Sequence, residues 1–201
     1  MKKPVRKDAQ RNRDRLLTVA VAAFTKDANA SLDSIAKVAG VGIGTLYRHF
    51  PTREALIEAA YRNEVDKLGD SAAELLKDHA PDDALGLLME RFIDYMSIKR
   101  GMAEALRGVV AAGSDPRNYS RARLTEAVSV ILQAGKDANV LRADVDATDV
   151  LSMSGAFLHL GDNPQQARRL AAILVDGLRY QSGVTPPKLK KKPKKKRRKK
   201  A

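Results

Sequence analysis

The sequence predicts an all-α protein with about nine helices in total, and three observations support this fold class. Hydrophobic residues make up 44% of the 201 residues, but aromatic residues make up only 4% and there is no Trp, which favours small aliphatic packing between helices. Apolar residues recur at spacings of three and four along most of the chain. Short stretches of turn and capping residues separate these segments. We therefore expect a small N-terminal helical unit followed by a larger helical bundle.

Four helices are expected in the first third of the chain, over residues 11–24, 31–39, 43–49 and 52–77. Ser31 and Thr52 can cap the second and fourth of these helices. Gly40 can supply the positive φ that the turn after the second helix needs. Phe50 precedes a proline and should end the third helix. The connection after the first helix contains no glycine, so Asn29 is expected to take a left-handed conformation there.

Five further helices are expected over residues 82–99, 102–112, 119–139, 147–160 and 164–180. Gly101 and the turn at 113–116 separate the first three of them, and Pro164 suits the first turn of the last. Charge divides the chain in a similar way. Lys and Arg outnumber acidic residues 12 to 6 up to Asn63, acids outnumber bases 18 to 14 over 64–187, and residues 188–201 carry 11 bases and no acid. This distribution indicates a polyanionic partner at the two ends.

Several classes of protein are excluded by composition. Without cysteine, the chain forms no disulfide, thiolate metal site or cysteine nucleophile. No apolar run is long enough to cross a bilayer, so we expect a cytoplasmic, nucleoid-associated protein with no membrane partner. No Glu-x-x-His pair, nucleophile elbow or phosphate-binding glycine loop is present, so we expect no enzyme activity and no metal or other cofactor. His159 is interpreted as a helix-end or dimer-contact residue rather than as a metal ligand.

The two short helices of the first third have the layout of a helix-turn-helix, a motif that places its second helix in the DNA major groove. The small side chains of Ala36 and Ala39 let the helices approach, and a shared core is expected from Ile35, Val38, Val41 and Leu46. No acidic residue lies between Asp33 and Glu54, so this surface can approach phosphates without repulsion. The two glycines at 42 and 44 should leave the second of these helices loosely formed until DNA binds.

The stretch from Leu32 to Leu56, LDSIAKVAGVGIGTLYRHFPTREAL, closely resembles the signature of tetracycline-repressor-like (TetR-type) regulators. The resemblance is strong over residues 11–64, and it implies that Thr45 and Arg48 contact base edges while Tyr47 and His49 hold phosphates. Arg53 would bind a phosphate where the family usually has Lys. Ser31 caps its helix and is equally expected to contact the DNA backbone. The full set of expected DNA-binding residues is Ser31, Gly42, Thr45, Tyr47, Arg48, His49, Arg53 and Arg11.

The domains are expected at residues 1–51 for the N-terminal arm and the helix-turn-helix, 52–182 for effector binding and dimerisation, and 183–201 for a disordered basic tail.

One helix face carries Met89, Phe92, Tyr95 and Met96, which indicates either core packing or an apolar pocket. The resemblance implies that a small-molecule effector binds there, with Tyr119 and Phe157 as further candidate contacts. The expected dimer contacts are Ala156, Leu160, Leu170, Leu174 and Leu178.

The function that these patterns predict is a homodimeric, sequence-specific DNA-binding regulator, a repressor released from a palindromic operator by an unidentified small-molecule effector. In the tail, Lys194, Lys195, Lys196, Arg197 and Arg198 are expected to bind double-stranded DNA without sequence preference. Alternatively, the tail is an anchor for RNA or for an acidic membrane, or it is an appended segment. The alternative function is a tail-led, non-specific nucleic-acid-binding or chromatin-like structural protein.

Overall fold

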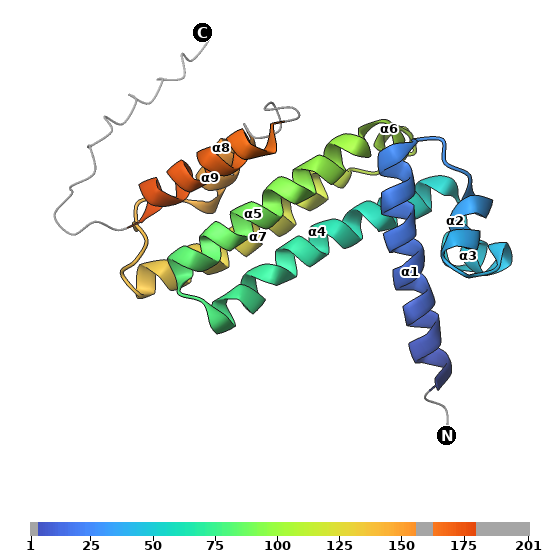
Figure 1. Ribbon diagram of the computed structural model, residues 1–201, viewed down its shortest axis with the longest axis horizontal. Coiled ribbons are helices and arrows are strands. Elements are labelled where there is room, and N and C mark those ends of the chain that lie inside the picture. The colour runs from blue at the N-terminus through green and yellow to red at the C-terminus, as the bar shows by residue number, and fades with distance from the viewer. Residues whose placement is uncertain (1–3, 156–162, 180–201) are drawn as a thin grey trace, which may run out of the picture.

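The computed structural model describes residues 4–155 and 163–179, with side chains from residue 8 onward, and this part of the chain consists of helices joined by turns and loops, with one isolated β-bridge between Leu141 and Arg179 (Figure 1). The helices are α1 (Pro4–Lys26), α2 (Leu32–Val38), α3 (Ile43–His49), α4 (Arg53–Asp78), α5 (Pro81–Gly101), α6 (Ala103–Ala111), α7 (Pro116–Asp137), α8 (Ala147–Ser154) and α9 (Pro164–Leu178). The predicted all-α fold class is confirmed. None of the described helices is long and apolar enough to span a membrane.

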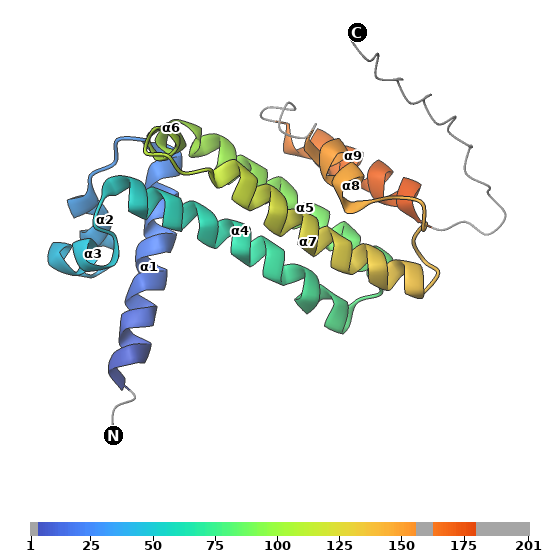
Figure 2. The ribbon, with the colours of Figure 1, turned by 180° about the vertical axis from the view of Figure 1, so that it is seen from behind.

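The molecule is elongated, with α1 to α3, which we call the head, at one end of α4 to α9, which we call the body (Figures 1 and 2). The long helices α4, α5 and α7 lie side by side and form the centre of the body. At the end of the body farthest from the head, α8 packs on α7 and α9 packs on α5. The uninterrupted helix α4 contacts α1 and also α5 and α7, so a single rigid element joins head and body.

The core extends continuously through both parts of the described chain. Its largest fully buried side chains include Phe24 and Leu46 in the head and Tyr61, Met89 and Ile131 in the body. A second head-to-body contact lies where α5 ends, because a Cβ at Gly101 would collide with the side chain of Thr25 on α1. Position 101 therefore requires glycine because α1 and α5 approach closely there, as well as because the helix ends there.

Helix starts follow local capping chemistry. Ser31 accepts a hydrogen bond from the Ser34 amide at 3.3 Å, and Thr52 accepts one from the Ala55 amide at 3.1 Å, as predicted. Gly40 has the predicted positive φ of 68°. Helix α7 begins three residues earlier than predicted, because Asp115 caps it and Pro116 occupies its first turn.

Three sequence expectations about the head are wrong. Val38 is 71% exposed and lies outside the predicted shared core. Asn29 has no positive φ, because Asn139 is the only non-glycine residue with one in the described chain. Gly42 is the extended N-cap of α3 rather than part of that helix, so only Gly44 weakens its helix propensity.

Candidate nucleic-acid interface and body cavity

Helix α3 is attached to the head by one fully buried side chain, Leu46. Its neighbours in sequence point the other way: Tyr47 is 48% exposed and Arg48 is also exposed. The short helix therefore separates its folding contact from its polar surface. Gly42, the N-cap, is exposed and lacks a side chain, so the backbone at the start of α3 is accessible.

The two expected base-contact residues contact each other. An Nη2 hydrogen of Arg48 is donated to the Oγ1 atom of Thr45 at 2.9 Å, one helical turn away. This bond holds the guanidinium along the exposed side of α3, which reduces the conformational entropy lost when a base edge or phosphate is bound. The ring of His49 is half-buried and packs near Phe50, with ring centroids 6.1 Å apart.

A groove of about 510 Å³ separates α3 from the start of α1. It is lined by Asp8, Ala9, Asn12, Thr45, Arg48 and His49. Sequence reasoning assigned Arg11 of α1 to the DNA-binding surface, but it missed Asp8, Ala9 and Asn12 of the same helix and therefore the carboxylate beside α3. Arg11 forms an ion pair with that carboxylate, so the structure gives this expected DNA-binding residue an internal partner.

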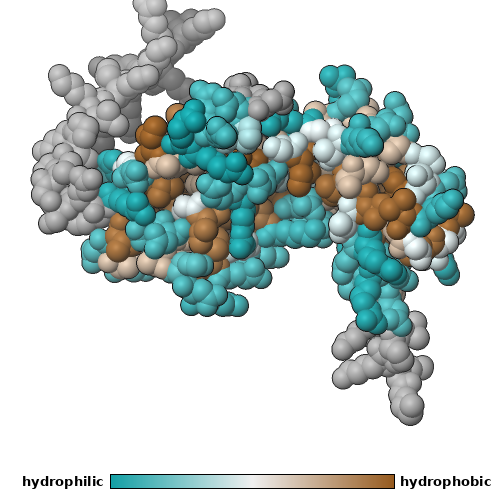
Figure 3. Space-filling view, in the orientation of Figure 1, coloured by the Kyte–Doolittle hydropathy of each residue, from teal (hydrophilic) through white to brown (hydrophobic). Residues whose placement is uncertain are grey.

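Figure 3 shows hydrophilic side chains over the described part of α1, which projects beyond the rest of the molecule. Arg11, Arg13 and Arg15 give α1 three guanidinium groups, and that of Arg15 reaches the turn between α2 and α3 beside Gly40. The Arg13 guanidinium lies 5.6 Å from the centroid of the Phe50 ring, so α1 and the end of α3 are also connected by a cation–π contact.

Arg53, expected to bind a phosphate, is engaged inside the head. One Nη1 hydrogen is donated to the Ala30 carbonyl at 2.8 Å, another guanidinium hydrogen goes to the Ala28 carbonyl, and the group lies 4.9 Å from the Phe24 ring centroid. These contacts explain how the short, glycine-free connection between α1 and α2 keeps its shape. Arg53 therefore positions the motif, and its phosphate contact stays a prediction, as does that of Ser31.

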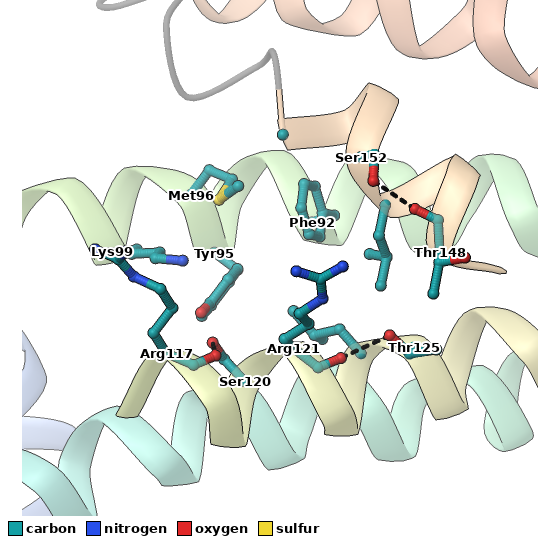
Figure 4. A pocket seen from close by; sticks show the side chains of 13 residues that line it. Phe92, Tyr95, Met96, Lys99, Arg117, Ser120, Arg121, Thr125, Thr148 and Ser152 are labelled. Carbon is teal, nitrogen blue, oxygen red and sulfur yellow. Dashed lines mark hydrogen bonds between the residues drawn. The ribbon is translucent and has the colours of Figure 1, made fainter. Parts of the chain in front are cut away.

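The body contains a cavity of about 190 Å³ between α5, α7 and α8, which we call the body cavity (Figure 4). Three of the expected ligand residues, Phe92, Tyr95 and Met96, line it. Met89 is fully buried elsewhere, with its sulfur accepting a hydrogen bond from Ser154 at 3.5 Å. Tyr119 points toward α4 and donates its hydroxyl hydrogen to Asp66. Phe157 lies outside the described residues.

A buried hydrogen bond joins the body cavity to α4. The hydroxyl groups of Tyr95 and Tyr61 lie 2.6 Å apart, and burial beside Tyr61 raises the pKa of Tyr95 well above its ordinary value. The Tyr95 phenol therefore stays protonated. Any ligand that displaces Tyr95 must move or break its contact with the helix that carries the head.

Three of the expected dimer contacts lie among the described residues, and their role in a dimer stays a prediction. Leu174 and Leu178 are buried and Leu170 is half-buried, all on the face of α9 that packs on α5. The exposed large apolar side chains of the described parts of α8 and α9 are Met153, 60% exposed, and Ile173, 66% exposed. Ala156 and Leu160 lie outside the described residues, as do the tail positions 194–198 and His159.

Two family models match this chain. Residues 16–60 match the model described as "Bacterial regulatory proteins, tetR family", and residues 80–180 match "Transcriptional regulator SbtR-like, C-terminal domain". The first match covers the helix-turn-helix and the start of α4. The second covers the helices that form the body cavity.

Solved structures of similar sequence have the same fold. A TetR transcriptional regulator, SCO0520 from Streptomyces coelicolor, is 46% identical with a TM-score of 0.78, covering 85% of this chain and 99% of that one. A TetR regulatory protein from Mycobacterium vanbaalenii is 33% identical with a TM-score of 0.72, covering 88% and 99%. The HTH-type transcriptional regulator SAUSA300_2515 of Staphylococcus aureus (strain USA300) is 39% identical over 117 residues, which are 57% of this chain and 62% of that relative's length.

Proposed function

The chain belongs to the TetR family of DNA-binding transcriptional regulators, and on this premise we propose that it binds a palindromic operator as a homodimer and acts as a repressor that a small-molecule effector releases. The observation that carries the proposal is that different side chains of α3 anchor the helix and form its exposed polar surface. Leu46 fixes the helix in the head while Tyr47 and Arg48 project from it, next to a groove shared with α1. A helix presented in this way fits the major groove of B-DNA.

Dimerisation follows from the small size of α3. A helix of 7 residues makes too few base contacts to select one site in a genome, whereas two copies reading half-sites about 34–36 Å apart multiply the selectivity. The exposed apolar groups of Met153 and Ile173, at the end of the body opposite the head, support a partner contact there. In such a dimer the two heads would remain free to bind DNA.

Release by an effector requires a path from the body to the head. The body cavity supplies the binding site, the hydroxyl pair of Tyr95 and Tyr61 supplies the link to α4, and α4 contacts α1. An effector shifts the equilibrium only by its preference for one arrangement of α4 over another. We therefore expect effector and operator to weaken each other's binding by the same factor.

The decisive experiment is selection of the full chain on a pool of random duplex DNA at near-physiological salt, followed by sequencing of the bound fraction. We expect a palindrome to be enriched, and Tyr47→Ala or His49→Ala to abolish the enrichment. Val38→Ala is the matched control, because it removes an exposed apolar group from the same motif and should leave the enriched sequence unchanged. A folded protein that enriches no sequence would refute the proposal.

The polybasic segment 188–201 is proposed to strengthen binding to any DNA through counterion release. Ending the chain at Pro187 should keep the selected palindrome and reduce the salt dependence of affinity by about 0.9 in log–log slope for each phosphate that the tail no longer neutralises. If binding to the palindrome disappeared altogether in the shortened chain, the alternative of tail-led, non-specific binding would replace our proposal.

A further inference from the structure

We infer that the effector is an amphipathic organic acid, with a carboxylate or phosphate group on an apolar body, held in the body cavity by Lys99, Arg117 and Arg121. This inference deepens the proposed function, since it rests on the premise that the body cavity receives an effector. The inference concerns the chemical class of the ligand, because proteins that share one fold can bind chemically different ligands.

The charge of the cavity lining is opposite to that of the segment around it. Residues 64–187 contain 18 acidic and 14 basic residues, yet the lining includes Lys99, Arg117 and Arg121 and no Asp or Glu. In Figure 4 the amino group of Lys99 is directed toward Tyr95, Arg117 lies beside it, and the guanidinium of Arg121 points between α7 and α8. Cations from two helices thus meet in one concave space.

These three cations lack the carboxylate partners that other basic residues of the body have. Arg123 pairs with Asp70 and with Glu126 at 3.0 Å, and Arg179 pairs with Asp82 at 3.0 Å. Among the described residues, no carboxylate lies within 4.0 Å of the charged groups of Lys99, Arg117 or Arg121. The positive charge in the cavity is therefore available to a ligand.

Lys99 shows the energetic cost of this arrangement. Burial, and then the nearby charge of Arg117, lower the pKa of its ammonium group below the ordinary value. A half-buried ammonium that faces a like charge destabilises a fold unless something compensates it, even though Arg117 itself is exposed. A bound anion would supply the negative charge that the Lys99 ammonium lacks. Lower stability without the ligand is expected of a binding site whose residues are selected for function.

The remaining polar groups of the cavity offer a ligand few hydrogen atoms. Ser152 donates its hydroxyl hydrogen to the Thr148 carbonyl at 2.6 Å, and Thr125 donates to the Arg121 carbonyl at 2.8 Å (Figure 4). Ser120 likewise donates to the Arg117 carbonyl at 3.0 Å. With these hydroxyl groups committed to their own helices, the available donors are mainly cationic, and they favour an oxyanion over a neutral acceptor.

Apolar groups complete the site and define the rest of the ligand. Phe92, Met96, Leu124 and Leu151 line the same cavity, so the anionic group must be attached to an apolar body. A second cavity of about 520 Å³, under α6, shares Lys99 and Arg117 and is also lined without any Asp or Glu. A ligand longer than the first cavity can therefore extend past these two residues into a space of the same charge.

The test compares four probes that share one 4-phenylbutyl body and differ in their end group: 5-phenylpentanoate, 4-phenylbutyl phosphate, 4-phenylbutanol and 4-phenylbutylamine. Binding of each to the full-length protein is measured by titration calorimetry. Hydrogen bonds to a charged group are stronger than those between neutral groups, so we expect at least one of the two anions to bind about tenfold or more tightly than the alcohol, and the amine to bind most weakly. The relative affinity of the two anions distinguishes carboxylate from phosphate.

Single substitutions to Met remove each charge while keeping an unbranched side chain. Lys99→Met and Arg121→Met should each weaken binding of the preferred anion about fivefold to tenfold and leave the alcohol unaffected. Arg91→Met is the control, because Arg91 is an exposed cation on α5 outside both cavities. In addition, Lys99→Met without ligand should unfold at the same or a higher temperature than the parent, since it removes a charge that burial penalises.

The outcomes separate this inference from the proposed function. Equal affinity for the anions and the alcohol, or a Lys99→Met variant that unfolds at a clearly lower temperature, overturns the anion inference while selection of a palindrome still supports the regulator. Preference for an anion without any enriched DNA sequence leaves the inference standing and refutes the regulator. An anion that binds as inferred and weakens operator binding supports both.

Discussion

The head and the body arrange their functional residues in opposite ways. On α3, the residue that holds the helix in place, Leu46, and the residues offered to DNA, Tyr47 and Arg48, lie on different faces. On α5, Phe92 and Tyr95 are both core residues and cavity walls. Stability and function can therefore change separately in the head, whereas in the body a substitution that alters one alters the other.

The shapes of the two ligands explain this difference. DNA is larger than the protein and is contacted from outside, so its contacts must be exposed and convex. A small molecule is surrounded, so its contacts must come from side chains that would otherwise fill the core. The same α-helical architecture serves both because α4 extends from one region into the other.

The largest effect should follow from truncating Phe92, which is 4% exposed. Phe92→Ala removes a buried ring and leaves a void, so we expect the free energy of unfolding to fall by about 3–5 kcal/mol. Chemical denaturation measures this loss. Leu87→Ala, a truncation at a 38% exposed position of the same helix, should cost far less. Equal losses for the two variants would show that the body does not combine core and cavity as described.

Tyr47→Ala should produce the next largest effect, confined to DNA binding. Truncating a contact residue of this kind typically costs about 2 kcal/mol, which corresponds to roughly thirtyfold in operator affinity. Thermal unfolding should be almost unchanged, because Tyr47 is 48% exposed. A large drop in unfolding temperature would mean that folding and DNA contact are not separated on α3.

Arg53→Lys tests how the connection between α1 and α2 is held. Lysine keeps the charge but cannot donate from two nitrogens to the Ala28 and Ala30 carbonyls at once, so we expect a loss of about 1–2 kcal/mol of stability. Denaturation of the parent and the variant at the same pH provides the comparison. A variant as stable as the parent, but weaker on DNA, would favour the phosphate role over the structural one.

Tyr61→Phe should have the smallest effect on stability, about 1 kcal/mol for one buried hydrogen bond. The more informative effect concerns the coupling between effector binding and operator binding. Operator affinity without ligand should be retained, whereas the effector should reduce operator affinity by a smaller factor than in the parent protein. Binding curves with and without effector measure this coupling. Unchanged coupling in Tyr61→Phe would show that the signal reaches α4 by another route.

Sequence reasoning succeeded in the head because its signals are local. The caps at Ser31 and Thr52, the positive φ of Gly40 and the inward side of Leu46 each depend on residues a few positions apart. It was wrong where a distant residue decides. The loop at Asn29 has no left-handed residue because the Asn29 amide donates to the Asp27 carboxylate at 2.8 Å, while the distant Arg53 holds the carbonyls of Ala28 and Ala30 on either side. Val38 was assigned to the core by its hydrophobicity alone.

In the body, helical periodicity found the buried faces but could not say what covers them. Leu174 and Leu178 form an apolar stripe whether the partner is α5 of the same chain or a second protomer, and the structure shows α5. The cavity cations were missed for a similar reason. Lys99 and Arg121 look like ordinary surface charges until the pairing of α5 with α7 brings them to one cavity.

The paired phenols of Tyr61 and Tyr95 also make the protein its own optical reporter. The chain has five tyrosines and no Trp, so phenol groups dominate its near-ultraviolet absorption, and the band of a phenol shifts with its hydrogen bonding. One of these two rings lines the body cavity and the other sits on α4. Occupancy of the cavity should therefore be recorded as an ultraviolet difference spectrum in unlabelled, unmodified protein, measured without DNA because nucleobases absorb over the same range.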